Sequence, residues 1–210
     1  NIEIHKNWIE LTKSEKADLI VFPELSLTGY EPELAKELAM DKNDSRLDGF
    51  QKISDSNKIS IGLGVPTKSE LGILISMVIF QPDKERKIYS KQMLHSDELP
   101  YFTEGDGQLI LNAEDKRIAP AICYESLQNE HSENAIKLGA EIYLASVAKS
   151  QNGIEKAYTH YAKIAEKYSM PVIMVNNMGF CDNFLGAGQS AVWDKNGRIL
   201  GELKNDREGL

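Results

Sequence analysis

Three side chains suited to acyl-transfer chemistry, Glu24, Lys91 and Cys123, each stand where a predicted strand of the 210-residue chain gives way to a loop. A thiol attacks a carbonyl carbon, a carboxylate can take the thiol proton, and an ammonium group stabilises the oxyanion that forms. This is the logic of a Ser-His-Asp triad built from different residue types. The three residues therefore make a complete set for acyl transfer, provided that the fold brings them together.

A structural interpretation of the same residues stays open at this point. Most unpaired cysteines are small buried apolar residues, and most Glu and Lys side chains are ordinary surface charges. Against the surface interpretation, Glu24 follows an apolar strand pattern, where an unpaired charge is expensive to bury. Lys91 has polar neighbours on both sides, so the surface interpretation is stronger for it.

The elements that would position these residues alternate between helices and strands, with hairpins mixed in. This order predicts an α/β domain with mixed sheets, and in such folds ligands bind at the carboxyl ends of strands. We expect helices at residues 4–13, 32–40, 47–57, 129–138 and 154–168, and strands at 17–22, 59–65, 71–81, 87–90, 109–111, 118–123, 140–145, 171–176, 188–193 and 198–203.

Composition narrows the classes of protein. With 41% hydrophobic and 27% charged residues, a chain of this length suits one buried domain over residues 1–210. The net charge of −8, with basic residues interspersed among acids, argues against a nucleic-acid partner. No apolar run has the length of a membrane span, so no membrane partner is expected. The chain starts at Asn1 without a methionine and stops abruptly at Leu210, so we expect both ends to be incomplete.

Cysteine and histidine usage give further expectations. The two cysteines, Cys123 and Cys181, are too few for a disulfide scaffold, which favours a reducing cytoplasm. Cys181 is predicted to be a loop thiol. The four histidines lack metal-ligand spacing, and no Gly-rich phosphate loop is present, so neither a metal nor a cofactor is expected.

Several segments together resemble the signatures of the nitrilase superfamily, the carbon-nitrogen hydrolases. Residues 22–30, Phe-Pro-Glu-Leu-Ser-Leu-Thr-Gly-Tyr, resemble the first signature of that family. The order Glu, Lys, Cys and the approximate distances match as well, and the similarity covers nearly the whole chain. The other matching segments are residues 89–91 with Leu94 (lysine motif), Glu98 with Phe102 and Gly105 (the loop after it), residues 122–125 (cysteine motif) and residues 188–190 (a late element).

The resemblance implies an α-β-β-α sandwich whose subunits commonly pair, so a homodimer or higher homo-oligomer is expected. It implies that Cys123 is the nucleophile, Glu24 the general base and Lys91 the oxyanion stabiliser. The backbone N–H of Tyr124 would be the second oxyanion donor, and Glu98 a second carboxylate that positions the lysine and the substrate. It also suggests that a first strand precedes this chain and that final strands follow it.

The chain departs from the family pattern in two places. After Cys123-Tyr124-Glu125, the arginine of many amidase-type members is absent, and Tyr124 argues mildly against a nitrile substrate because the nitrilase branch usually has tryptophan. After the next strand, Ser146 and Lys149 replace a common proline and tryptophan. Lys149 could therefore face the pocket and pair with a substrate carboxylate. The alternative, a solvent-facing lysine at the start of a loop, is the commoner arrangement.

The resemblance implies a hydrolase that cleaves a non-peptide C–N bond of a small linear amide or carbamoyl compound through a Cys123 thioester. The alternatives are a nitrilase or an N-acyltransferase on the same scaffold, and a catalytically silent binding or regulatory member. The presence of Glu24, Lys91 and Cys123 favours the enzyme, while fold resemblance alone does not determine the substrate.

Overall fold

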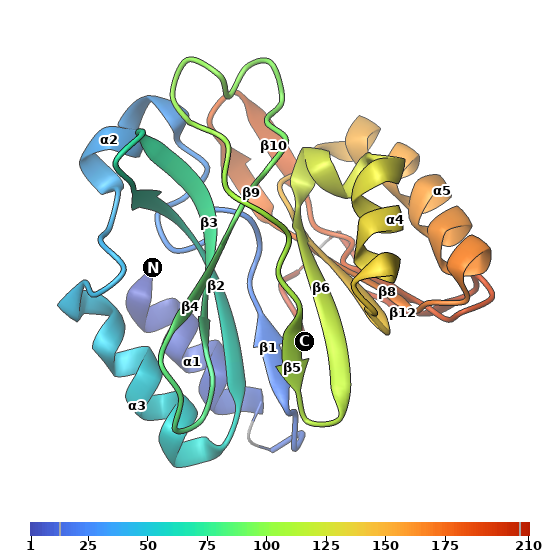
Figure 1. Cartoon of the computed structure of the whole chain (residues 1–210), viewed down its shortest axis with the longest axis horizontal. Helices are drawn as coiled ribbons and strands as arrows, with labels where there is room; N and C mark the ends of the chain where they lie inside the picture. Colours follow the sequence, from blue (N-terminus) through green and yellow to red (C-terminus); the bar gives the residue numbers. More distant parts are fainter. Residues whose placement is uncertain (13, 206) are drawn as a thin grey trace.

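The first half of the chain forms a four-stranded sheet in the computed structural model, which describes residues 1–12, 14–205 and 207–210 (Figure 1). Its strands run in the order β1-β2-β3-β4. The β1–β2 pair is parallel and the other two pairs are antiparallel, so the sheet is mixed. The strands are β1 (Leu19–Val21), β2 (Ser60–Lys68), β3 (Ile73–Phe80) and β4 (Lys87–Ser90).

The second half forms a six-stranded sheet in the order β12-β11-β8-β7-β6-β5. Its centre, β6–β7–β8, is parallel, and its outer strands pair antiparallel. A separate two-stranded hairpin follows β8. The strands are β5 (Leu111–Ala113), β6 (Lys116–Ile122), β7 (Ile142–Val147), β8 (Val172–Asn176), β11 (Ala191–Trp193) and β12 (Ile199–Glu202), and those of the hairpin are β9 (Met178–Cys181) and β10 (Phe184–Ala187).

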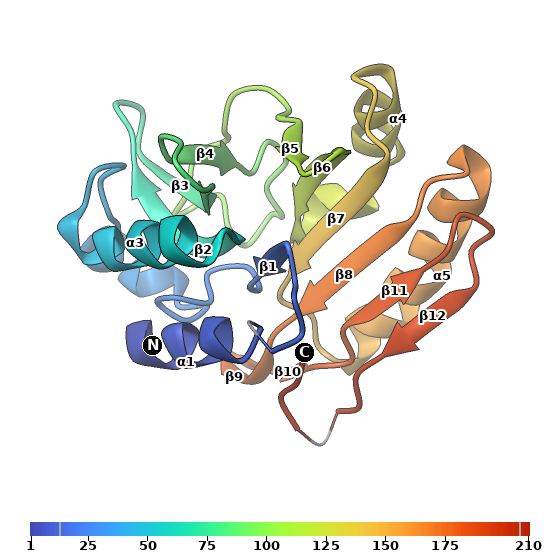
Figure 2. The same ribbon diagram turned by 90° about the horizontal axis from the view of Figure 1, so that it is seen from below.

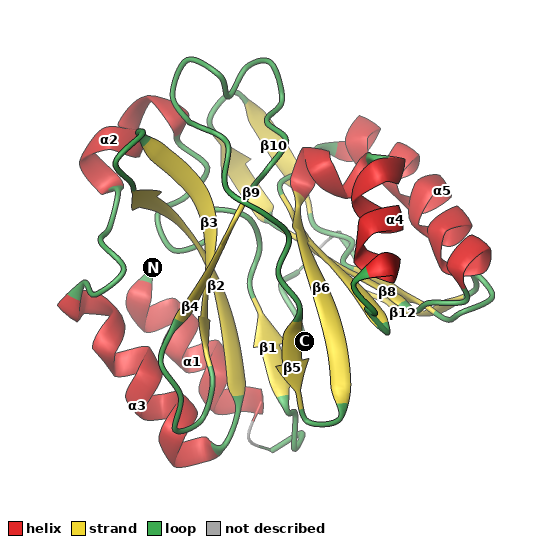
Figure 3. Cartoon of the chain, viewed as in Figure 1, coloured by secondary structure: helices red, strands yellow, loops and turns green. Residues whose placement is uncertain are grey.

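Helices cover the outer face of each sheet (Figures 2 and 3). On the four-stranded sheet these are α1 (Ile2–Thr12) and α3 (Asp48–Asn57), and on the six-stranded sheet α4 (Asn129–Lys137) and α5 (Gln151–Tyr168). Shorter pieces are α2 (Ala35–Leu38) and three 3₁₀ helices, η1 (Pro32–Leu34), η2 (Ser45–Leu47) and η3 (Cys123–Leu127). Within the described residues, every helix is too short or too polar to cross a membrane.

Three apolar clusters hold the four layers together. Ile9 of α1 and Phe50 of α3 pack with Ile61 of β2 in one cluster. Tyr161 of α5 packs with Trp193 of β11 in another. The middle cluster joins the inner faces of the two sheets, with members Ile75, Met77, Ile79, Tyr89, Leu111, Ile118, Ile122 and Leu144. Since each sheet face needs an apolar partner, this arrangement confirms the predicted α-β-β-α class.

Several predicted boundaries were wrong for local reasons. The helix expected over residues 32–40 ends at Leu38, because the N–H of Met40 donates to the carbonyl of Pro66 at 2.9 Å and pairs the chain with β2. The strand expected over 109–111 starts only at Leu111.

The β9–β10 hairpin was not predicted, and Cys181 is a buried residue at the end of β9 rather than a loop thiol. The helix expected over residues 4–13 begins earlier, at Ile2, and is described as far as Thr12, while Lys13 lies outside the described residues.

Candidate active site

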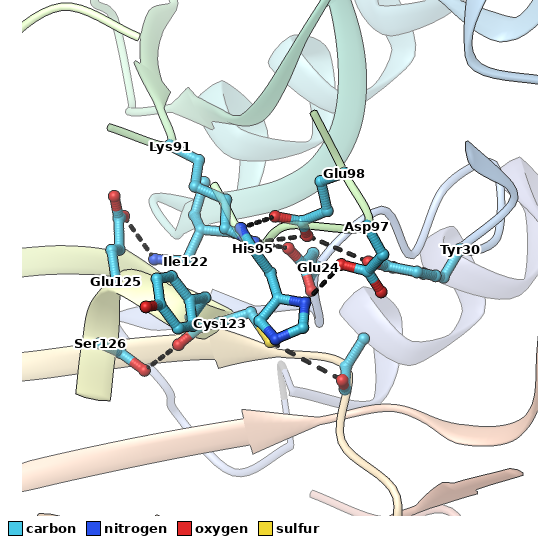
Figure 4. Close-up of polar contacts among 12 residues, drawn as sticks. Glu24, Tyr30, Lys91, His95, Asp97, Glu98, Ile122, Cys123, Glu125 and Ser126 are labelled. Carbon is cyan, nitrogen blue, oxygen red and sulfur yellow. Dashed lines mark hydrogen bonds and ion pairs between the residues drawn. The ribbon is translucent and has the colours of Figure 1, made fainter. Parts of the chain in front are cut away.

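Lys91 lies at the centre of the candidate site, directly after β4. Its ammonium group donates to Glu24 Oε1 at 2.8 Å and to Glu98 Oε1 at 2.6 Å, with all three side chains almost fully buried (Figure 4). Buried charges persist only when they are paired and hydrogen-bonded. An ammonium group has three N–H donors, so a third donor of Lys91 is left for a ligand.

Glu24 is held in a tight turn that follows β1. The turn places Leu25 in the left-handed region, with φ of +52°. A Cβ at Gly64 of β2 would lie 2.2 Å from the Pro23 carbonyl oxygen and 2.4 Å from the Leu25 nitrogen, so only glycine lets β2 approach this closely. The second carboxylate oxygen of Glu24, Oε2, is buried and has no hydrogen-bond partner among the described residues. An unpaired buried acceptor is costly, and this one is free to take a proton.

Cys123 follows β6 as the first residue of η3. Its backbone is strained, with φ of +47°, a conformation that is uncommon outside glycine and that is often found at functional sites. Its sulfur lies 3.7 Å from the Ala148 carbonyl oxygen and 3.8 Å from Lys149 Nζ, and part of the residue remains accessible to solvent. Tyr124 comes next in the first turn of η3, where the backbone N–H groups of a helix have no acceptor within the helix.

The electrostatics of the site follow from its burial. Burial raises the pKa of the Glu24 carboxyl to about 7; Lys91 and the Cys123 thiol oppose this rise, and the charge of Glu98 adds to it. Burial also raises the pKa of the Cys123 thiol to about 11, helped by the Glu24 charge and opposed by Lys149 and Lys91. Burial would lower the pKa of Lys91, but the negative groups around it raise that pKa above its usual range. At neutral pH the site therefore holds a neutral thiol, a half-ionised carboxyl and a permanent cation.

Glu98 is positioned by two further donors. The Tyr30 hydroxyl donates to Glu98 Oε1 at 3.0 Å, and the His95 backbone N–H donates to Oε2 at 2.7 Å (Figure 4). Burial and the nearby carboxylates raise the pKa of Tyr30 far above its usual range, so its hydroxyl remains a donor. Tyr30 lies in the segment that carries the family resemblance, yet the sequence did not indicate this contact.

Glu125 was also missed as a positioning residue. Its Oε1 accepts from the Ile122 N–H at 2.7 Å and the Tyr89 hydroxyl at 2.6 Å, and its Oε2 accepts from the Gln92 N–H at 2.6 Å. One carboxylate thus fixes the backbone directly before Cys123 and directly after Lys91. This fully buried carboxylate has no distinct sequence signal, because two of its three donors, at Tyr89 and Gln92, lie more than 30 residues earlier in the chain.

The remaining predicted site residues divide into two kinds. The Ser146 hydroxyl donates to the Phe22 carbonyl at 3.0 Å, so it supports the end of β1. Lys149 is buried and directed at the thiol, so the solvent-facing alternative is wrong. Asn176, at the end of β8, was missed; its side chain bonds both the N–H and the carbonyl of Lys149. A polar residue at a strand's carboxyl end is the signal that could have indicated it.

The described residues of the candidate site supply reactive side chains but no group of metal ligands. Among residues 1–12, 14–205 and 207–210, no three His, Cys, Asp or Glu side chains are grouped to hold a metal ion. A thiol, an unpaired carboxylate oxygen and an ammonium group with a donor to spare are suited to nucleophilic attack on a carbonyl. A cavity of about 320 Å³ lies elsewhere, between α1, the end of β1 and residues near Leu210, and its lining includes none of Glu24, Lys91 or Cys123.

A family model described as "Carbon-nitrogen hydrolase" matches residues 1–210. The chain belongs to the carbon-nitrogen hydrolase family. The resemblance of its sequence segments to the carbon-nitrogen hydrolases is thereby confirmed.

Curated relatives of this carbon-nitrogen hydrolase family member include two glutamine-dependent NAD(+) synthetases. That of Aquifex aeolicus is 24% identical over 206 residues, covering 94% of this chain and 36% of the relative. That of Acinetobacter baylyi is 23% identical over 211 residues, covering 94% and 38%. The chain thus spans little more than a third of the length of these relatives.

Solved structures of the amidase from Nesterenkonia sp. AN1 share the fold of this carbon-nitrogen hydrolase family member. A variant carrying acrylamide at its active-site cysteine by Michael addition has a TM-score of 0.88 at 19% identity, covering 97% of this chain and 82% of that one. A complex with butyramide has the same TM-score and identity, covering 97% and 80%.

Proposed function

We propose that this protein hydrolyses a non-peptide C–N bond of a small linear amide or carbamoyl compound through a thioester on Cys123. The observation that carries the proposal is the cluster of Glu24, Lys91 and Glu98 beside a strained cysteine. The family membership supports it, and so do the structural neighbours, one of which is described with butyramide and another with acrylamide at its active-site cysteine.

The first half-reaction uses each group once. The sulfur of Cys123 attacks the carbonyl carbon while Glu24 Oε2 takes the thiol proton. The oxyanion is stabilised by the spare donor of Lys91 and by the backbone N–H of Tyr124. The Glu24 carboxyl then returns the proton to the leaving nitrogen as the C–N bond breaks, which leaves a thioester and releases ammonia or an amine.

The second half-reaction reuses the same base. Glu24, again a carboxylate, takes a proton from a water molecule that attacks the thioester carbonyl. Lys91 stabilises the second oxyanion, and collapse returns the proton to the sulfur as the acid leaves. Glu98 acts as a positioning residue, because its Oε1 accepts a second hydrogen bond from the ammonium group of Lys91, at 2.6 Å.

Intact-mass spectrometry of the protein mixed with a panel of amides tests this function. The panel contains butyramide, acetamide, glutamine, a carbamoyl amino acid and a nitrile, with Cys123→Ala as the key variant. Cys181→Ala is the matched control, since the other cysteine lies in β9. We expect a transient mass gain equal to the acyl group in the wild type and the control, and none in Cys123→Ala.

The same panel separates the alternatives. Turnover of the nitrile alone indicates a nitrilase, and product formation only with an added amine indicates an N-acyltransferase. Equal turnover by wild type and Cys123→Ala refutes the thioester route. A protein that turns over no compound favours a binding or regulatory role. We also propose that the subunits form a homodimer or higher homo-oligomer, on the family resemblance, and light scattering measures that state.

A further inference from the structure

The candidate site holds a second buried cation, Lys149, whose role the proposed chemistry does not require. The residue is 7% exposed, and its Nζ lies 3.8 Å from the sulfur of Cys123. Among the described residues, no carboxylate lies within ion-pair distance of this ammonium group. A buried ammonium without a counter-anion is expensive, so the fold keeps it at a cost.

The anions of the site do not supply the missing partner. Glu24 and Glu98 both bind Lys91, at 2.8 and 2.6 Å. The Cys123 thiol is neutral at physiological pH, because burial raises its pKa to about 11. Lys149 therefore faces the sulfur of Cys123 without a counter-anion among the described residues.

Lys149 is also held in place. Its backbone N–H donates to Asn176 Oδ1 at 2.8 Å, and its carbonyl accepts from Asn176 Nδ2 at 3.1 Å and from the Ala187 N–H at 2.9 Å. Its aliphatic stem runs past Gly153 in the first turn of α5, where an added Cβ would lie 3.3 Å from Lys149 Cβ. This support gives the ammonium group a fixed place beside the sulfur, which is what recognition of a ligand charge needs.

We infer that Lys149 binds a carboxylate of the substrate, and that the substrate class is amides or carbamoyl compounds with a carboxylate within a few bonds of the scissile carbonyl. This inference rests on the proposed function. Because the ammonium group is so near the sulfur, a carboxylate one or two carbons beyond the atom attacked by Cys123 lies within its reach. A charge-assisted hydrogen bond there selects acidic over neutral substrates.

Alkylation of Cys123 by iodoacetate and by iodoacetamide tests the inference without a known substrate. In both reactions the sulfur displaces iodide from a CH₂ group: an S–C bond forms, the C–I bond breaks, and Glu24 takes the thiol proton. The reagents differ only in a carboxylate or an amide next to that carbon. The measured quantity is the rate constant for iodoacetate divided by the rate constant for iodoacetamide. This ratio is then divided by the same ratio measured with glutathione.

We expect this normalised ratio to be about 10 in the wild type, which corresponds to a preference for iodoacetate of about 1.4 kcal/mol. Lys149→Met should bring it to about one, and Lys149→Arg should retain most of the preference. Lys156→Met, an exposed lysine of α5, is the matched control and should keep the wild-type ratio. Thermal melting of each variant shows whether it is folded.

A wild-type ratio near one overturns the inference, and so does a Cys123 that neither reagent reaches. If Lys149→Met slows both reagents by the same factor, Lys149 stabilises the thiolate instead, and the carboxylate assignment is wrong. These outcomes are separate from a failure of the proposed function, because alkylation needs no amide turnover. A protein with the tenfold preference that hydrolyses no amide would keep the anion site and lose the hydrolase proposal.

Discussion

Replacement of Glu24 by Gln should change the pH dependence of Cys123 reactivity as well as its rate. If Glu24 is the base for the thiol, alkylation of Cys123 by iodoacetamide follows the ionisation of Glu24, whose pKa burial raises to about 7. The rate constant should then rise about tenfold per pH unit below pH 7 and reach a plateau between about pH 8 and 10.

The magnitude follows from the two ionisations. With a pKa of about 11, only about one Cys123 in 10⁴ is a thiolate at pH 7, whereas about half of Glu24 is a carboxylate. General-base catalysis typically contributes 10²–10⁴-fold. We therefore expect Glu24→Gln to be roughly 100-fold slower at pH 7, with no plateau near pH 8. Its rate should climb with thiol ionisation at alkaline pH, at a pKa below 11 because the Glu24 charge that raises it is gone.

The assay is stopped alkylation followed by intact-mass spectrometry from pH 5 to 10, with modification assigned to Cys123 by peptide mapping. Glu33→Gln is the matched control, since Glu33 is an exposed carboxylate in η1. A wild-type rate that rises steadily to pH 10 without a plateau would refute the reasoning. An unchanged profile in Glu24→Gln would do the same.

Two further predictions concern stability. Gly64→Ala should lower the free energy of unfolding by about 1–3 kcal/mol, because its Cβ would overlap the backbone of the Glu24 turn. Urea unfolding measures this change. Gly201→Ala is the control and should change the free energy of unfolding little, because the space around Gly201 is open. Acidification from pH 6.5 to about 4 should reduce stability by up to about 3 kcal/mol through His131, because burial lowers its pKa to about 4 and only the unfolded chain binds the proton in that range. Urea midpoints across this range should fall less in His131→Asn, and an equal fall in both proteins would assign the acid sensitivity to other groups.

The sequence predicted the strands that precede Glu24, Lys91 and Cys123 well, because the local residue pattern marks where each of these strands ends. It did not show that the three meet. Glu24 and Lys91 follow strands of one sheet and Cys123 follows a strand of the other. The packing of the two sheet faces depends on the middle apolar cluster, which includes Met77 and Ile122 and leaves no local pattern in the sequence. Only the family resemblance indicated that these three side chains lie close together.

The misses share a physical cause, which is dependence on distant partners. Glu125 is fixed by donors up to 36 residues away, at Tyr89 and Gln92. The orientation of Lys149 depends on Asn176, 27 residues later. The β9–β10 hairpin lacked a sequence signal because some of its exposed residues, such as Phe180 and Leu185, are apolar. The alternation of apolar and polar residues that marks a half-buried strand is therefore absent.

The division of the chain between its two sheets has a consequence for when its chemistry becomes possible. All strands of the first sheet lie before Lys91, and all strands of the second lie after Glu98. Translation therefore delivers Glu24, Lys91 and Glu98 before Cys123 leaves the ribosome. The thiol meets its base only when the second sheet packs on the first, so the reactive centre is completed by the docking of the two sheets. Heat or a cut that separates the sheets would end the reactivity while leaving every reactive side chain intact.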